Sequence, residues 1–294
     1  LNWLAVGRWL RKRRAKIIIT AFWLPFMGPC LGTILRMVGQ ASHRIGLVHN
    51  MIPHEQRPGD RPFSRYFTGA NDAFMTLSEA VADDVKMFSA APVRTAPHPV
   101  YDSYGELLDK TAARAQLGLD PEQRYALFFG FIRDYKGLDL LLEAMADERL
   151  ADVKLIVAGE FYGNQAKYEA LIAQLGIADR LELRTEFIAN EDVRYYFCAA
   201  DVVVQPYKTA TQSGISQLAY HFERPMIVTR VGGLPEIVPH EQAGLVVDVA
   251  AAAVADGLVR FYAEDLEEQL QRGVIKEKTR YSWSGFVKEL QQLW

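Results

Sequence analysis

One stretch in the middle of the chain decides how the rest is interpreted: Tyr125-Ala-Leu-Phe-Phe-Gly-Phe-Ile-Arg-Asp-Tyr-Lys-Gly137. Its apolar start, 125–129, is typical of a strand buried on both faces of a parallel sheet. Arg133 and Lys136 then lie between Gly130 and a second glycine. A turn from strand to helix needs a glycine or a cap, but it does not need two cations. An arginine fork and a lysine point charge both bind phosphate, so the stretch favours an anion site over a plain solvated loop.

Around this stretch, short apolar runs alternate with amphipathic segments along the whole chain. Such alternation predicts an α/β protein with doubly wound parallel sheets. With 294 residues, 50% of them hydrophobic, the chain is long enough to bury two cores. The predicted strands are 16–22, 45–49, 73–77, 92–95, 125–129, 153–158, 181–184, 202–205, 226–229 and 244–247, and the predicted helices include 29–38, 78–88, 138–145, 165–175, 190–198 and 214–222.

A break in this alternation falls at 96–105, which holds two prolines, a glycine and no periodicity. We interpret it as a linker between a first domain, 1–96, and a second domain, 97–281. The amphipathic segment 282–294 is expected to pack back on a domain face. Ligands of open α/β sheets bind outside the carboxyl ends of the strands, so two such domains are expected to face a common cleft.

Charge is distributed unevenly, although the net charge is only -3. All 36 acidic residues follow residue 50, whereas eight of the 33 Lys and Arg residues precede it. The basic, tryptophan-bearing stretch 3–16 fits peripheral contact with an anionic membrane, and equally a surface helix whose last-turn cations complement its dipole. Cys30 and Cys198, both in apolar surroundings, indicate neither a disulfide framework nor a zinc site, which fits the reducing cytoplasm.

The uncharged segment 17–35 is long enough to be a membrane-spanning candidate. Two prolines and two glycines in its middle favour a different interpretation, a strand followed by a turn and a helix. A second candidate anion site lies after the strand 202–205, where Thr211, Gln212, Ser213 and Gly214 precede a predicted helix. The free N–H groups of a helix start favour an anion, and together with Arg133 and Lys136 they would complete a diphosphate clamp.

Taken in order, five motifs resemble the nucleotide-sugar-binding domain of the family-4 retaining glycosyltransferases. They are GFIRDYKG (130–137) with LDLLLEA (138–144), LIVAG (155–159), DVVVQP (201–206) and RPMIVTRVGGLPE (224–236). The resemblance is strong over 97–281 and looser over 16–96. It implies the GT-B fold, two Rossmann-like domains with the donor between them, and a first domain that is truncated at its start. It also implies that Arg133 and Lys136 bind the donor diphosphate, with Gly130, Ser213 and Gly214 beside them.

The family resemblance also assigns the remaining candidates. His49 ends a predicted strand and is the catalytic candidate, while His54 and Glu55 are candidates for the acceptor side. The family has two glutamates flanking the helix start, but the segment 210–218 contains none. Gln217 stands at or beside the second position and can still hydrogen-bond a donor hydroxyl. Thr211, Gln212 and Ser213 stand in place of the first glutamate, which the family uses at the donor sugar. The identity of the donor sugar therefore stays open.

The implied activity is transfer of a sugar from a nucleoside diphosphate sugar to a hydroxyl of a glycan or lipid-linked acceptor, with retention of configuration, in polysaccharide biosynthesis. No cofactor and no nucleic acid are expected. No metal is expected either, since no Asp-x-Asp pair follows a predicted strand. The protein is expected in the cytoplasm, with peripheral contact at the inner face of the membrane. Two alternatives remain: a non-catalytic nucleotide-sugar-binding subunit, and a GT-B-fold epimerase or phosphorylase acting on sugar phosphates.

Overall fold

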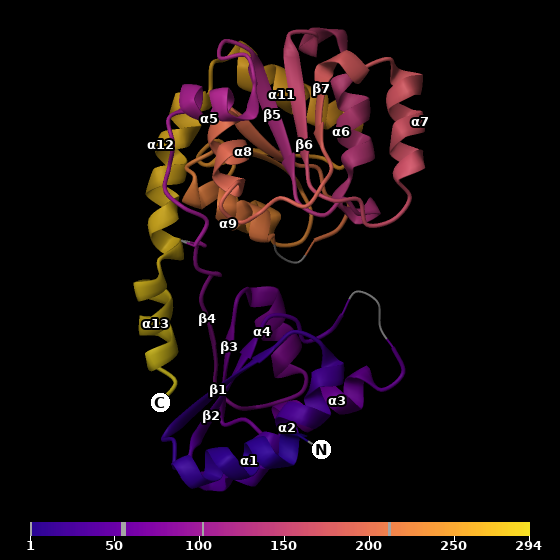
Figure 1. Ribbon diagram of the computed structural model, residues 1–294. Coiled ribbons are helices and arrows are strands. Elements are labelled where there is room, and N and C mark those ends of the chain that lie inside the picture. Colours follow the sequence, from indigo (N-terminus) through magenta and orange to yellow (C-terminus); the bar gives the residue numbers. More distant parts are fainter. Residues whose placement is uncertain (1, 54–56, 102, 211–212) are drawn as a thin grey trace. The chain divides into compact units, whose positions relative to one another are not determined.

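A computed structural model describes residues 2–53, 57–101, 103–210 and 213–294 (Figure 1). The chain divides into two compact units, which are described separately. The first contains the residues up to 99 together with 281–294, and the second contains residues 100–280. Each unit is built on one parallel sheet, of four strands in the first and six in the second. Cys30 and Cys198 belong to different units, and both are free thiols.

The sheet of the first unit runs in chain order, β1-β2-β3-β4, and all of its pairs are parallel. Helices α2, α3 and α4 cover one face through a core that includes Leu35, Phe67 and Val85. The opposite face is covered by the carboxyl-terminal helix α13, which contributes Phe286 and Leu290. The strands are β1 (Ile17–Phe22), β2 (His43–Val48), β3 (Ala73–Thr76) and β4 (Val93–Thr95); the helices are α1 (Asn2–Arg13), α2 (Gly28–Val38), α3 (Asp60–Thr68), α4 (Glu79–Lys86) and α13 (Trp283–Gln291).

The uncharged segment 17–35 folds as a strand, a turn and a helix, as its prolines and glycines predict. Strand β1 ends at Phe22, a short 3₁₀ turn covers Pro25–Met27, and α2 begins at Gly28. A proline in the first turn of α2 is compatible with the helix because that N–H has no intrahelical partner. Among the helices described, none has the length and apolar character needed to cross a membrane.

The six-stranded sheet of the second unit has the order β10-β9-β8-β5-β6-β7. Its strand order therefore reverses between β5 and β8, as it does in doubly wound nucleotide-binding sheets, where the ligand lies outside the carboxyl ends at the reversal point. The strands are β5 (Arg124–Phe129), β6 (Val153–Ala158), β7 (Leu181–Arg184), β8 (Val202–Gln205), β9 (Met226–Thr229) and β10 (Gly244–Val247).

Helices α6, α7 and α11 pack against one face of this sheet, around a core of Leu141, Val157 and Leu258. Helices α5 and α8 lie against each other elsewhere in the unit (Figure 1). The helices of the unit are α5 (Lys110–Leu117), α6 (Leu138–Met145), α7 (Gln165–Leu175), α8 (Val193–Ala199), α9 (Gly214–His221), α10 (Leu234–Ile237), α11 (Ala251–Ala263) and α12 (Glu267–Lys278).

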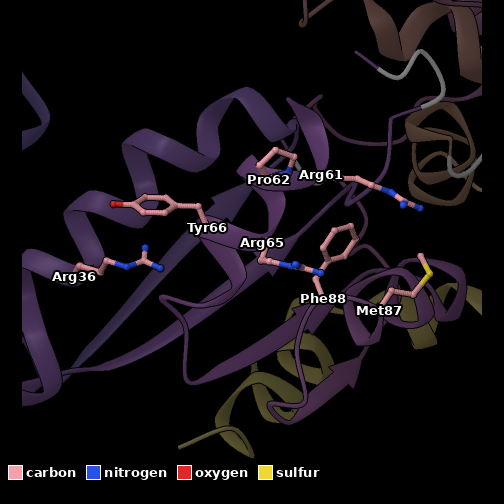
Figure 2. A pocket seen from close by; sticks show the side chains of 7 residues that line it. All are labelled: Arg36, Arg61, Pro62, Arg65, Tyr66, Met87 and Phe88. Atoms are coloured by element: carbon pink, nitrogen blue, oxygen red, sulfur yellow. The ribbon is translucent and has the colours of Figure 1, made fainter. Parts of the chain in front are cut away.

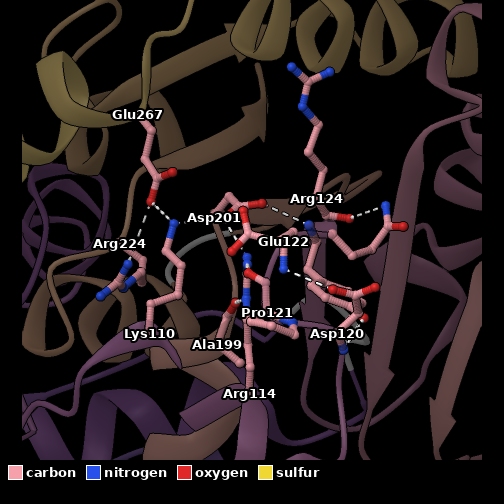
Figure 3. Close-up of polar contacts among 12 residues, drawn as sticks. Lys110, Arg114, Asp120, Pro121, Glu122, Arg124, Ala199, Asp201, Arg224 and Glu267 are labelled. Carbon is pink, nitrogen blue, oxygen red and sulfur yellow. Dashed lines mark hydrogen bonds and ion pairs between the residues drawn. The ribbon is translucent and has the colours of Figure 1, made fainter. Parts of the chain in front are cut away.

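A buried ion network at the amino ends of β5 and β8 connects three elements of the second unit (Figure 3). One carboxylate oxygen of Asp201 accepts hydrogen bonds from Lys110 Nζ at 2.7 Å and from Arg114 Nη2 at 2.8 Å. Its other oxygen accepts from the backbone N–H of Tyr125 at 2.7 Å. Glu267 at the start of α12 also accepts from Lys110, at 2.5 Å. Because these groups are satisfied together, α5, α12 and the sheet are held in one arrangement.

Candidate functional site

A cavity of about 510 Å³ lies in the second unit beside the ends of β5 and β6 and the start of α9. The strand order reverses at β5, so this is the edge at which such sheets bind ligands. Most of its wall is aromatic or aliphatic. The lining residues are Tyr101, Tyr104, Phe129, Gly130, Phe131, Lys136, Gly159, Glu160, Phe187, Ile188, Asn190, Val193, Gly214, Ile215 and Leu218.

Two glycines bring the backbones of β5 and β6 together at the floor of this cavity. A Cβ atom on Gly159 would lie 2.5 Å from the carbonyl oxygen of Gly130, a distance that no side chain tolerates. Gly130 and Gly159 also have φ angles of +95° and +134°, which favour glycine. The motif glycines therefore shape the cavity itself and leave its floor open.

Lys136 lines the cavity and lies within a few ångströms of the end of β5, since a Cβ atom added to Gly130 would lie 3.0 Å from Lys136 Nζ. Its side chain is buried, with 9% of the residue exposed, and it forms no ion pair with a carboxylate of the described residues. Burial, with a smaller contribution from the charge of Arg133, lowers the pKa of Lys136 to about 8. An ammonium held without a counter-ion beside an open cavity is a ready partner for an anion.

Arg133, the other predicted cation, is exposed and does not line the cavity. Its guanidinium carbon lies 4.0 Å from the centre of the Tyr162 ring, in cation–π geometry. Tyr162 in turn meets Phe131 edge to face at 6.4 Å, so Arg133 belongs to an exposed aromatic group at the rim. The structure thus brings only Lys136 of the predicted pair to the cavity wall.

The predicted helix start is present, since Ser213 is the N-cap of α9 and Gly214 lines the cavity. The Ser213 hydroxyl donates to Gln205 Oε1 at 2.6 Å and therefore points into the protein. Ser216 donates to the same oxygen at 3.0 Å. Gln205, at the end of β8, consequently positions the first turn of α9 through two hydroxyls, and what α9 can offer a ligand is its backbone N–H groups.

Of five other predicted site residues, only Gln217 lies within the described part of the chain. Gln217 is buried, is not among the residues that line the cavity, and its Oε1 has no hydrogen-bond partner in the described part of the chain. The donor-side candidates Thr211 and Gln212 lie outside the described residues, as do the acceptor-side candidates His54 and Glu55.

His49 directly follows β2 in the first unit, at the carboxyl edge of that sheet. Its ring stacks on Trp23, which follows β1, with centroids 5.0 Å apart, and the His98 ring is 6.1 Å away. Burial, with a smaller contribution from the charge of His98, lowers the pKa of His49 to about 4. His49 is therefore a neutral imidazole at neutral pH, able to accept or donate a hydrogen bond.

Several cavity residues were not predicted from the sequence. Tyr101 and Tyr104 lie in the segment that was interpreted as a linker, and Phe187, Ile188 and Asn190 follow β7. The signal for the latter group was their place in the chain, because residues that follow a parallel strand reach the same sheet edge as those after β5. Within the described residues, no three His, Cys, Asp or Glu side chains are grouped as a metal site.

Comparison with known proteins places the second unit in a family. Residues 123–264 match the family described as glycosyl transferases, group 1. A curated relative is the D-inositol 3-phosphate glycosyltransferase of Segniliparus rotundus, 33% identical over 60% of this chain. Another is the D-inositol 3-phosphate glycosyltransferase 1 of Catenulispora acidiphila, 27% identical over 85% of this chain. The chain spans 40% and 64% of the lengths of these two relatives.

Solved structures show the same fold over nearly the whole chain. Sucrose-phosphate synthase from Thermosynechococcus elongatus superposes with a TM-score of 0.80 at 21% identity, covering 99% of this chain and 76% of that one. Anabaena HepE, solved in complex with UDP and glucose, gives a TM-score of 0.75 at 17% identity and covers 98% of this chain and 79% of its own. With its two parallel α/β units the chain has the GT-B fold, and residues 123–264 of its second unit match the group 1 glycosyltransferases.

Proposed function

We propose that this chain transfers a sugar from a nucleoside diphosphate sugar to a hydroxyl of a glycan or lipid-linked acceptor. The observation that carries the proposal is the cavity at the strand reversal, where buried Lys136 faces an aromatic and aliphatic wall. A ligand that fits such a site has a flat apolar part and an anionic part. A nucleoside diphosphate has both. We propose that the transfer retains configuration, on the resemblance of the motifs to the family-4 retaining glycosyltransferases.

In this proposal the rings of Tyr101 and Phe187 border the nucleoside, and Lys136 with the N–H groups at the start of α9 binds the diphosphate. The ammonium would then stabilise the negative charge that develops on the leaving diphosphate. Arg133 can take part only by leaving the ring of Tyr162, so we expect its removal to cost less than that of Lys136.

The relatives suggest which ligands to test first. HepE was solved with UDP-glucose, so UDP and UDP-sugars are the first donors. The curated relatives are named for D-inositol 3-phosphate, which makes this compound the first acceptor. As catalytic group on the first unit we propose His49, which is neutral and lies at the carboxyl edge of its sheet.

The test is a thermal-shift titration with UDP, GDP, ADP and their sugar conjugates. At about 100 times its dissociation constant, a ligand stabilises the folded state by about 2.7 kcal/mol. We expect one nucleotide to raise the melting temperature of the wild type and of Lys154→Ala, which removes a lysine from a weak pair with Glu182. The shift should vanish in Lys136→Ala. If no nucleotide shifts the folded protein, the proposal fails.

A second candidate function, a non-catalytic nucleotide-sugar-binding subunit, is favoured by one observation. The segment 210–218 around the start of α9 has no glutamate, although the family has two there. Incubating the protein with donor and acceptor and analysing the products separates the two functions. Glycosylated acceptor supports the transferase, an epimerised donor would indicate an epimerase, and binding without turnover would indicate the subunit.

A further inference from the structure

A second cavity, of about 730 Å³, lies in the first unit and is lined by three arginines (Figure 2). None of the described residues in its wall is acidic. The lining residues are Arg36, Arg61, Pro62, Arg65, Tyr66, Met87 and Phe88. A positively charged cavity with one phenol and three apolar side chains has the composition of a site for an anion that carries a carbon skeleton.

The place of this cavity in the fold separates it from the candidate catalytic edge of the same unit. Arg36 lies in the last turn of α2, Arg65 in the last turn of α3, and Met87 directly follows α4. These helices lead into the amino ends of β2, β3 and β4. His49, in contrast, lies at the carboxyl end of β2. The arginine-lined cavity is therefore not part of the proposed transfer site.

The Arg36 guanidinium is held in a fixed orientation. Its central carbon lies 3.9 Å from the centre of the Tyr66 ring, and its Nη1 donates to the carbonyl of Gly32 at 3.0 Å. The hydroxyl of Thr33 donates its proton to the carbonyl of Pro29 at 2.6 Å. The Tyr66 hydroxyl lies 3.1 Å from Thr33 Oγ1 and therefore donates to that oxygen. Arg36 is thus oriented before any ligand arrives, which lowers the entropy lost on binding.

A glycine in α2 makes this stack possible. A Cβ atom on Gly32 would lie 2.8 Å from Tyr66 Cδ1 and 2.9 Å from Arg36 Nη1. Glycine inside a helix costs about 1 kcal/mol relative to alanine, so alanine would be the better residue for the helix alone. Gly32 is the residue that leaves space for the paired ring and guanidinium.

An ordinary helix end explains only part of this arrangement. Cations in the last turn complement the helix dipole, and this accounts for Arg36 and Arg65 one at a time. It does not account for several guanidinium groups lining one cavity, where they repel one another. Among the described residues of the first unit, ion pairs are formed by Arg44, Lys86 and Arg94 and by none of the cavity arginines.

We propose that this cavity binds a phosphate group through Arg36 and Arg65, with Met87 and Phe88 against the carbon part of the ligand. In Figure 2, the side chains of Arg61 and Arg65 both extend away from Arg36 and Tyr66. Arg61 belongs to the rim, and Arg65, which points toward Phe88, must turn toward Arg36 when the two share one phosphate. The ligand is a phosphate ester, either soluble or the headgroup of a lipid. The proposal is independent of the donor site in the second unit, because none of its residues lies there.

Met87 provides a local signal for the test. Methyl-labelled methionines are observed by NMR while glycerol 3-phosphate is added to the full chain, and the Met87 resonance is assigned through Met87→Leu. We expect a saturable shift of this resonance. The apparent dissociation constant should rise about tenfold or more in Arg36→Ala/Arg65→Ala, which removes both charge-assisted contacts.

Two further variants separate a built site from general attraction. Gly32→Ala keeps the charge but displaces the Arg36–Tyr66 stack, so it should weaken binding as well. Arg8→Ala/Arg11→Ala removes the same charge from the exposed face of α1 and should leave binding unchanged. The proposal is wrong if Met87 does not respond, or if the two double variants lose affinity equally.

Vesicles distinguish the two sources of the phosphate. Sedimentation with phosphatidylcholine vesicles is compared with and without phosphatidic acid. Binding to phosphatidic acid that requires Arg36 and Arg65, but not Arg8 and Arg11, assigns the lipid headgroup. A glycerol 3-phosphate response combined with vesicle binding that does not depend on Arg36 and Arg65 assigns the soluble ester.

Discussion

At the scale of single residues, Lys136 is a buried lysine whose pKa is lowered well below its ordinary value. It has a pKa of about 8 because it is buried, with a nearby cation and no carboxylate partner among the described residues. Below pH 8 it is charged in the folded protein, and between about 8 and 10.5 it is neutral there but charged in the unfolded chain. The folded state therefore binds fewer protons in this range, and Lys136 makes stability rise with pH between these values.

Binding of a diphosphate should reverse this shift, because an anion favours the charged form. We predict that UDP binding takes up a proton between pH 8 and 9 and that affinity falls as pH rises through 8. Calorimetry in buffers of different ionisation enthalpy measures the uptake. Lys136→Arg, which stays charged, should abolish it. Identical proton uptake in Lys136→Arg would show that another group is responsible.

His49 is a second residue whose pKa is changed by its surroundings in the folded protein. Its pKa of about 4 is lowered mainly by burial, of which Trp23 is a part, and less by the charge of His98. We predict that Trp23→Ala raises the pKa of His49 toward 6.5 more than His98→Ala does, as followed by NMR of the imidazole. Since the unfolded chain protonates below 6.5 and the folded chain only below about 4, the contribution of His49 to stability is lost as pH falls through this range.

How far the sequence specifies the site can be judged from the same loop. Lys136 was predicted from its place after a buried strand, and the structure puts it in the cavity wall. Arg133 has the same sequence signal, but it lies on Tyr162, which is far along the chain and could not be paired with it from the sequence. Likewise the serine of the helix start is turned inward by Gln205, a tertiary contact that a capping pattern does not reveal.

At the scale of elements, the strands were more predictable than the helices. Each predicted strand is present within a few residues. For most of them the signal is an apolar run, which is required of a strand covered on both faces, whereas the edge strands β4 and β7 are more polar. Helix α12 was not predicted, since only Leu270 and Val274 of its residues are buried. The amino end of α12 is held by the ion pair of Glu267 with Lys110. Because these two residues are far apart in the sequence, the pair could not be predicted from it. Helix α3 has an early proline, which a helix tolerates in its first turn but which weakens the sequence signal.

The ion network that attaches α5 and α12 to the sheet gives a prediction about stability. Asp201→Asn leaves Arg114 buried without its carboxylate, and we expect it to destabilise the second unit by about 3–5 kcal/mol. The matched control is Asp152→Asn, which removes the exposed pair with Arg124 and should cost about 0–1 kcal/mol. Urea unfolding monitored by hydrogen exchange of β5 measures both. Equal effects of the two variants would show that the network adds no more than a surface pair.

At the scale of the whole molecule, the chain returns to its first unit at the end. The amphipathic pattern of 282–294 indicated an apolar face of Trp283, Phe286, Leu290 and Trp294. In the structure these two tryptophans are about half exposed, and the buried positions are Phe286, Leu290 and Leu293. A tryptophan in a short helix is a poor guide to burial because its large ring is often only partly covered.

The return is fixed by polar contacts as well as by packing. His43 Nε2 donates to the carbonyl of Leu293 at 2.6 Å, and Arg94 pairs with Glu289 at 2.9 Å. These contacts tie α13 to β4 and the residues that follow α13 to β2, so one face of the first sheet is covered by residues far from it in the chain. Because the two units have separate cores, unfolding of the chain need not be a single two-state transition.

This arrangement predicts which unit loses stability when α13 is weakened. Phe286→Ala removes a buried ring from the core that includes Ile45 and Met75, and should cost about 3–5 kcal/mol. The neighbouring Val287 is 42% exposed, so Val287→Ala should change stability by less than about 0.5 kcal/mol. Amide hydrogen exchange of the full chain should then show faster exchange in β2 and β3 of Phe286→Ala and unchanged exchange in β5 and β6. Faster exchange in both sheets would mean that the units unfold together, because stability lost at α13 would then reach the sheet that α13 does not cover.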